Sequence, residues 1–212
     1  MEVLIFPKNE EKALQMEKYM KNLFSFAGVP KPERALLQQP LLDESKNLSI
    51  SEVLAFVYYY YYEQIEREYQ YVAIDLVQKN IKRLTFEDLV VLLPLVQKKE
   101  WWDSIDSWRK VYSTWCKAYP EQREEVFQLF EKKEDFWLRR IAITLQLGYK
   151  QQTDTGLLIR AIDEDRQTKE FFIQKAIGWA LRDYSKTDAD WVKRQLTTDL
   201  SKLAVREASK YL

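Results

Sequence analysis

The 212-residue sequence predicts an all-α fold, and three observations point to this class. Only 4 Gly and 6 Pro occur, whereas an all-β sandwich or barrel would need a turn about every 8 to 12 residues. Hydrophobic residues make up 46% and charged residues 31%, which is typical of a folded globular chain. Helix-capping patterns precede apolar residues spaced three and four positions apart. We therefore expect about twelve helices with short connections, in a single domain over residues 1–212.

The expected helix starts can be followed along the chain. Ser49 to Glu52 has the form of a capping box, and Thr187 to Asp190 comes close to that form. Three further side chains are expected N-caps. They are Thr85, Thr168 and Ser201.

An acidic residue followed by an aromatic one opens four of the expected helices. These pairs are Glu68-Tyr69, Glu100-Trp101, Asp135-Phe136 and Glu170-Phe171, with spacings of 32, 35 and 35 residues. Such a period, with one helix pair per unit, predicts an α-solenoid of about six HEAT- or armadillo-like pairs. One helix of each pair then lines the concave side, so equivalent positions face the same way.

Missing residue types exclude several chemistries. The chain has no His and one Cys, Cys116, which rules out His-based catalytic triads, His-containing metal sites and internal disulfides. We expect no metal and no cofactor. The apolar run Val3 to Phe6 is too short for a signal peptide, and the uncharged run Val53 to Tyr62 is too short to span a bilayer. The sequence therefore predicts a soluble cytoplasmic protein that does not bind membranes.

The net charge does not identify a partner. Lys and Arg together number 33, and Asp and Glu together also number 33. A nucleic-acid-binding protein with this balance would have to gather its cations on one face.

The segment WWDSIDSWRKVYSTW contains more aromatic side chains than its core stripe needs. Trp101, Ile105, Trp108, Tyr112 and Trp115 form a complete apolar stripe. Trp102 and Asp106 lie four residues apart on a neighbouring face. They are candidates for a functional site. Alternatively, Trp102 packs against the next repeat and Asp106 is solvated or pairs with Lys110.

Two further segments carry cations beside an apolar stripe. In EFFIQKAIGWALRDYSK, a ladder of Lys175, Trp179, Arg182 and Lys186 suits a nucleic-acid backbone, although a solvated basic face is equally compatible. In DFWLRRIAITLQL, Arg139 and Arg140 accompany an otherwise apolar helix, and one of the two is expected close to the inner surface. An arginine there suits a phosphate, and the alternative is an ion pair with Glu131 or Asp135.

The repeat template brings these candidates together. Counted from the acid of each pair, Trp102, Asp106, Arg140 and Trp179 fall within one sector of about 100 degrees, at about 100 degrees per residue. The three successive repeats that carry them therefore direct two tryptophans, one carboxylate and one arginine to the same side.

Six stretches resemble the AlkD-type family of DNA alkylation repair enzymes, which are alkylpurine DNA glycosylases built of HEAT-like repeats. They follow the family's order over nearly the whole chain, and WWDSxD with FFIQKAIGWALR is a specific combination. The stretches are YMKNLFSFAGVPKPER, EREYQYVAIDLVQK, KEWWDSIDSW, FWLRRIAITLQLGYK, KEFFIQKAIGWALRDYSKT and LSKLAVREASKYL.

The resemblance implies roles for individual residues. Asp106 matches the catalytic aspartate, and Trp102 and Trp179 match two tryptophans that contact the sugar. Arg140 matches a phosphate-binding arginine, Arg182 a cation of the inner surface, and Tyr19 an aromatic residue near the DNA. Lys175 and Lys186 join the expected DNA-binding face through the basic ladder.

The resemblance also implies an activity: base excision repair of N3- and N7-alkylpurines in double-stranded DNA, by a monomer. The alternative is a non-catalytic helical-repeat scaffold that binds a protein or an unusual DNA structure on its concave face. The balanced net charge favours this alternative slightly.

Overall fold

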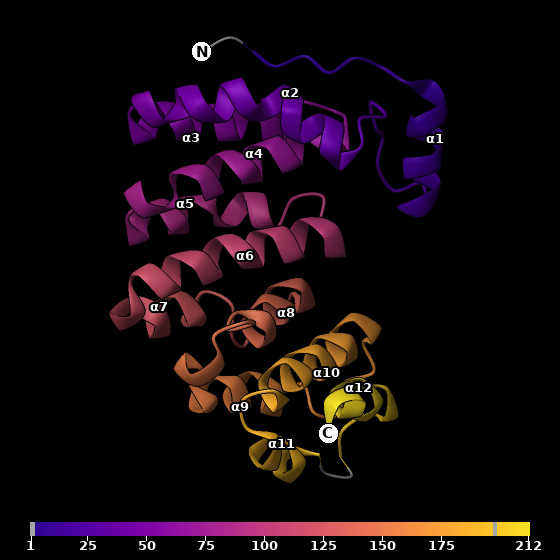
Figure 1. The fold of residues 1–212 in the computed structure, drawn as a ribbon, viewed down its shortest axis with the longest axis vertical. Helices are drawn as coiled ribbons and strands as arrows, with labels where there is room; N and C mark the ends of the chain where they lie inside the picture. Colours follow the sequence, from indigo (N-terminus) through magenta and orange to yellow (C-terminus); the bar gives the residue numbers. More distant parts are fainter. Residues whose placement is uncertain (1–2, 197–198) are drawn as a thin grey trace. The chain divides into compact units, whose positions relative to one another are not determined.

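The structure, a computed structural model, describes residues 3–196 and 199–212, and within them it contains twelve α-helices and no β-strand (Figure 1). The predicted all-α class is therefore confirmed. The helices are α1 (Glu10–Tyr19), α2 (Lys31–Glu44), α3 (Ile50–Tyr58), α4 (Arg67–Asn80), α5 (Phe86–Val96), α6 (Trp102–Ala118), α7 (Arg123–Gln128), α8 (Phe136–Thr144), α9 (Thr155–Glu164), α10 (Phe171–Ser185), α11 (Ala189–Gln195) and α12 (Lys202–Ala208).

The chain divides into two compact units, Met1–Leu95 and Val96–Leu212. In the first unit, α2 and α3 both pack on α4, whose side chains Val72, Leu76 and Val77 are fully buried. At the start of α4, the buried carboxylate of Glu68 accepts three backbone N–H groups from residues 27 to 29, each at 3.0 Å. Glu68, the acid of the first acid-aromatic pair, therefore fixes the loop at residues 27 to 29 to α4.

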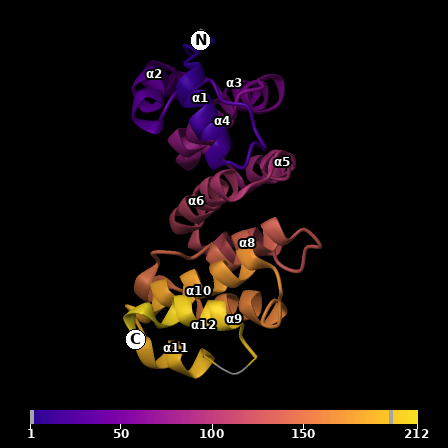
Figure 2. The same cartoon turned by 90° about the vertical axis from the view of Figure 1, so that its right-hand side faces the viewer.

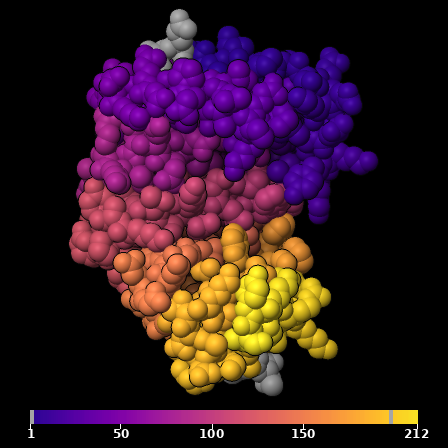
Figure 3. All heavy atoms as spheres, viewed as in Figure 1, coloured from indigo at the N-terminus to yellow at the C-terminus, as the bar shows by residue number. Residues whose placement is uncertain are grey.

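In the second unit, helices that are not consecutive in the sequence pack side by side. Helix α8 contacts α6 and α10, and α10 in turn contacts α12 (Figure 2). Helices α7, α9 and α11 each pack against the helix that precedes them. In the space-filling view, the yellow C-terminal residues lie against the orange residues of α10 (Figure 3).

The repeat predicted from the acid-aromatic pairs corresponds to real helices. Helices α4, α6, α8 and α10 begin at residues 67, 102, 136 and 171. Asp135 and Glu170 are N-caps that accept a backbone N–H two residues on. Glu68 lies within the first turn of α4, and Trp101 rather than Glu100 precedes α6. The spacing between these helix starts is thus nearly constant, whereas the acids of the pairs do not all have the same local role.

Most of the expected N-caps are also confirmed. Ser49 forms the full capping box with Glu52, Thr85 exchanges bonds with Asp88, and Ser201 caps α12. Two assignments were wrong by one or two residues. Glu170 caps α10, and the hydroxyl of Thr168 only accepts the N–H of Glu170. Asp188, not Thr187, caps α11, because the helix begins at Ala189.

Candidate active site

Helix α6 buries the stripe that the sequence predicts and leaves a second face partly exposed. Ile105, Trp108 and Tyr112 have no exposed surface, and Trp115 is 1% exposed. Asp106, on the neighbouring face, is partly exposed. So is Trp102, one turn earlier. The stripe residues occupy the core-facing positions of α6, so the Asp106 side chain can interact outside the hydrophobic core.

Asp106 forms a two-point ion pair with Arg140 of α8. Nε of Arg140 donates to Oδ1 of Asp106 at 3.0 Å, and Nη2 donates to Oδ2 at 3.0 Å. The Arg140 side chain is 6% exposed and that of Asp106 is 23% exposed. Asp106 therefore pairs with Arg140 and not with Lys110, and Arg140 pairs with Asp106 and not with Glu131 or Asp135. Bidentate geometry fixes the carboxylate in both position and orientation.

The remaining polar contact of Arg140 reaches a third helix. Its Nη1 donates to the backbone carbonyl of Phe172 in α10 at 2.7 Å. The ring of Phe172 packs against Trp101 and Trp137, with centroids 5.2 and 4.8 Å apart, and the two tryptophans lie 5.8 Å apart. These three aromatic side chains come from the starts of α6, α8 and α10. The cluster therefore holds together the helices that carry Asp106 and Arg140.

Arg139, the neighbour of Arg140, points to a different partner. Its Nε lies 2.9 Å from Oδ2 of Asp165, and its Nη1 donates to the carbonyls of Lys133 and Glu134. Arg139 thus ties α8 to the end of α9 and to the turn before α8, a structural role. Of the two adjacent arginines, only Arg140 joins the candidate site.

Trp179 of α10 lies beside a residue that the sequence analysis missed. The guanidinium carbon of Arg109, on α6, is 5.7 Å from the centroid of the Trp179 ring. Arg109 is half-buried, and burial lowers its pKa, while the nearby Asp106 carboxylate acts in the opposite direction. A signal was present in the sequence, because Arg109 follows Asp106 by three residues and so shares its face.

The basic ladder of α10 meets a carboxylate that the sequence analysis also missed. Glu207 of α12 is 5% exposed, and its oxygens lie 3.1 Å from Nζ of Lys175 and 3.0 Å from Nη1 of Arg182. Hydrogen bonds from Lys210 and Lys175 lower the pKa of Glu207 to about 2. Lys186 lies 4.7 Å from the ring centroid of Tyr211. Part of the ladder's charge is therefore balanced within the protein.

Tyr19, the remaining predicted site residue, belongs to the other compact unit. It ends α1 and is 71% exposed. Its predicted place near DNA stays a prediction, as does the concave DNA-binding face.

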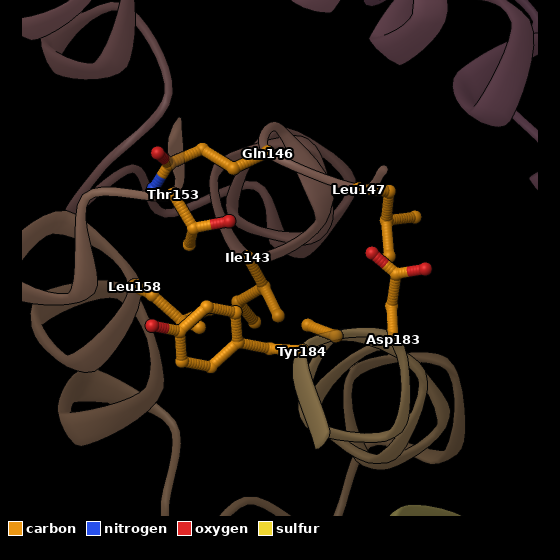
Figure 4. A pocket seen from close by; sticks show the side chains of 8 residues that line it. Ile143, Gln146, Leu147, Thr153, Leu158, Asp183 and Tyr184 are labelled. Carbon is orange, nitrogen blue, oxygen red and sulfur yellow. The ribbon is translucent and has the colours of Figure 1, made fainter. Parts of the chain in front are cut away.

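Figure 4 shows a pocket formed by α8, α9, α10 and the segment that joins α8 to α9. Its lining includes Ile143, Leu158 and Tyr184, together with Asp183, which accepts the N–H of Gly148 at 2.6 Å. None of the predicted site residues lines this pocket. Within residues 3–196 and 199–212, no cluster of three His, Cys, Asp or Glu side chains suits a metal ion. No helix in the same ranges is long and apolar enough to cross a membrane.

Comparison with known proteins places this geometry in context. No curated protein matches the chain. One solved structure, titled a predicted DNA alkylation repair enzyme from Enterococcus faecalis, is 47% identical, covers 99% of each chain and has a TM-score of 0.96. A second, smu.31 from Streptococcus mutans UA159, is 18% identical, covers 96% of this chain and 98% of its own, and has a TM-score of 0.66. The second match concerns the fold alone.

A family model described as DNA alkylation repair enzyme matches residues 1–212. The chain therefore belongs to the DNA alkylation repair enzyme family, as its sequence motifs predict, and this membership implies a DNA substrate.

Proposed function

We propose that this protein is a DNA glycosylase that hydrolyses the N-glycosidic bond of cationic N3- and N7-alkylpurines in double-stranded DNA. The observation that supports this most is the Asp106–Arg140 pair, in which a partly exposed carboxylate is held at both oxygens by a buried guanidinium. Two partly exposed tryptophans, Trp102 on α6 and Trp179 on α10, belong to the same unit as this pair.

The substrate's own charge reduces what the protein has to supply. An alkylpurine that carries a positive charge departs as a neutral base, so no general acid is needed to protonate it. This suits a chain without histidine. What remains is to stabilise the oxocarbenium-like sugar and to place the attacking water, as in other glycosidic cleavages.

Asp106 is suited to both tasks. A unit charge pair separated by about 4 Å, at an effective dielectric constant of about 20, interacts by about 4 kcal/mol, or roughly a thousandfold in rate. Each carboxylate oxygen has two lone pairs, and Arg140 occupies one on each oxygen. The remaining lone pairs are available for a water molecule that attacks the sugar.

In this mechanism Arg140 is a positioning residue. Its contacts with Asp106 and with the Phe172 carbonyl restrict the carboxylate to one orientation. Orientation matters because a displacement of about 1 Å can cost roughly a hundredfold in rate. Trp102 and Trp179 would add aromatic faces against the cationic sugar, each contributing about 1 to 2 kcal/mol once water is excluded.

The first experiment compares the wild-type protein with Asp106→Asn on duplex DNA treated with a methylating agent. Free 7-methylguanine and 3-methyladenine are separated by chromatography and quantified. We expect the variant to keep its DNA affinity and to release base roughly a thousandfold more slowly, because the neutral amide cannot stabilise the cationic sugar.

Asp190→Asn is the matched control, because it removes a carboxylate from an exposed ion pair on α11, 3.1 Å from Lys193. Thermal unfolding of both variants shows whether the fold persists. Base release by Asp106→Asn at the wild-type rate would contradict the proposal. DNA binding by the wild-type protein without any base release would favour the scaffold alternative.

A further inference from the structure

Arg109 carries a positive charge beside the Asp106–Arg140 pair, and the Asp106 carboxylate near it is already paired with Arg140. Both Asp106 oxygens already accept hydrogen bonds from Arg140. Among the residues that the structure describes, no carboxylate forms an ion pair with Arg109, and its Nε–H is buried without a hydrogen-bond acceptor. The three side chains together carry a net charge of about +1, since Asp contributes −1 and each arginine +1.

The surroundings of Arg109 leave this charge poorly compensated. Arg140 repels it, and Asp183, whose charge acts on Arg109 in the opposite direction, already accepts the N–H of Gly148 at 2.6 Å. The ring of Trp179 offers a cation–π contact at 5.7 Å, which is weak compared with an ion pair. The buried Nε–H without an acceptor costs free energy in the protein alone, and an anion near the guanidinium would compensate its charge.

The chemistry of the site indicates which anion this is. A guanidinium presents its donors as a planar fork that matches two oxygens of a phosphate. Arg140 already uses three of its five N–H groups, two toward Asp106 and one toward the Phe172 carbonyl. Arg109 contacts Trp179, the side chain that the proposed function places against the deoxyribose. A phosphate bonded to that sugar would lie close to Arg109.

Building on the proposed function, we propose that Arg109 binds the backbone phosphate next to the damaged nucleotide, while Arg140 serves to hold Asp106. The resemblance assigns the phosphate to Arg140, so this inference divides the two roles between two arginines. Arg109 is then a DNA-binding residue on the same helix face as Asp106, one turn away.

The test measures how the affinity for an undamaged duplex depends on salt, for the wild-type protein, Arg109→Gln and Arg109→Lys. Each phosphate contact contributes about 0.9 to the slope of log affinity against log salt concentration. We expect Arg109→Gln to lose one such contact, so that its affinity falls about 3.5-fold less than that of the wild type between about 50 and 200 mM salt. Arg109→Lys should keep the wild-type slope, because the charge remains.

Lys193→Gln is the charge-matched control, since Lys193 is exposed and pairs with Asp190 on α11. Thermal unfolding without DNA adds a second readout. If the Arg109 charge is uncompensated until an anion binds, removing it does not destabilise the free protein, and Arg109→Gln should unfold at the wild-type temperature or above it. A lower unfolding temperature combined with an unchanged salt slope would show a structural role and overturn the inference.

The outcome can be separated from that of the proposed function. A reduced slope in Arg109→Gln supports the phosphate contact even if the wild-type protein releases no base. Base release by the wild type together with a wild-type slope in Arg109→Gln would reject the contact and leave the glycosylase proposal intact.

Discussion

Glu100 shows how burial sets the protonation of a single carboxyl group. It precedes α6, and burial together with the neighbouring Asp135 carboxyl raises its pKa to about 8. One of its oxygens is buried without a hydrogen-bond partner. Asp135 meanwhile accepts the N–H of Trp137 as the N-cap of α8. Two carboxyl groups at the starts of α6 and α8 therefore share a site that suits one negative charge better than two.

This arrangement predicts a pH dependence of stability. The ordinary pKa of Glu100 is 4.5 and its value in the fold is about 8, so between these limits the folded state binds more protons than the unfolded state. The free energy of unfolding should fall as the pH rises through this window. Glu100→Gln keeps a neutral side chain and should flatten the dependence, as measured by urea unfolding across the window.

Glu125→Gln, on an exposed position of α7, provides the control and should leave the pH dependence as in the wild type. Identical pH profiles for the wild type and Glu100→Gln would show that Glu100 is ionised in the fold and would contradict the prediction.

At the scale of elements, the contact between α10 and α12 depends on a glycine inside a helix. Gly178 is buried in the middle of α10 and lies against α12. A Cβ at this position would lie 2.4 Å from Cβ of Glu207 and 2.9 Å from the backbone oxygen of Ala204. Only a residue without a side chain allows α12 to approach closely enough for Glu207 to reach Lys175 and Arg182.

We therefore expect Gly178→Ala to destabilise the protein, although alanine is usually the better helix former by about 1 kcal/mol. Overpacking of this kind costs about 1 to 3 kcal/mol, and it should exceed the gain in helix propensity. Chemical denaturation measures the change. Gly156→Ala is the comparison, because a Cβ there would lie 3.1 Å from a side-chain oxygen of Asp154 and would not meet another helix. Equal stability of Gly178→Ala and the wild type would show that α12 can shift without cost.

At the scale of the whole molecule, balanced charge limits how DNA can be held. Lys and Arg number 33, as do Asp and Glu, and Glu207 already engages two cations of the predicted DNA-binding face. Under the two proposals, affinity for DNA comes from a few local contacts such as Arg109, in addition to the charge of the lesion itself. A net charge of zero adds no long-range attraction between the protein as a whole and a duplex.

For an undamaged duplex, we expect a salt slope no steeper than about −3, which corresponds to about three phosphate contacts. Fluorescence anisotropy over a range of salt concentrations measures this slope. A slope near −6 or steeper would mean that the protein gathers many more cations on one face than Lys175, Arg182 and Lys186 provide.

The sequence by itself determined the helical class, the repeat and which side chains the core does not use. These are local properties, because the 3.6-residue period of a helix assigns Asp106 and Trp102 to a face beside the buried stripe wherever that helix packs. Arg140 and Trp179 could be grouped with them for the same reason, since the repeat places equivalent offsets on one side.

Only the tertiary structure decided which charges meet. Asp106 pairs with Arg140, 34 residues away, rather than with Lys110 one turn along its own helix. Glu207 forms ion pairs with Lys175 and Arg182, and Arg109 lies beside Trp179 with no ion pair to a carboxylate among the described residues. Partners of this kind depend on the distance and angle between packed helices, which are set by the aromatic cluster at the helix starts and by the close approach at Gly178. Those contacts join residues far apart in the chain, so no local pattern specifies them.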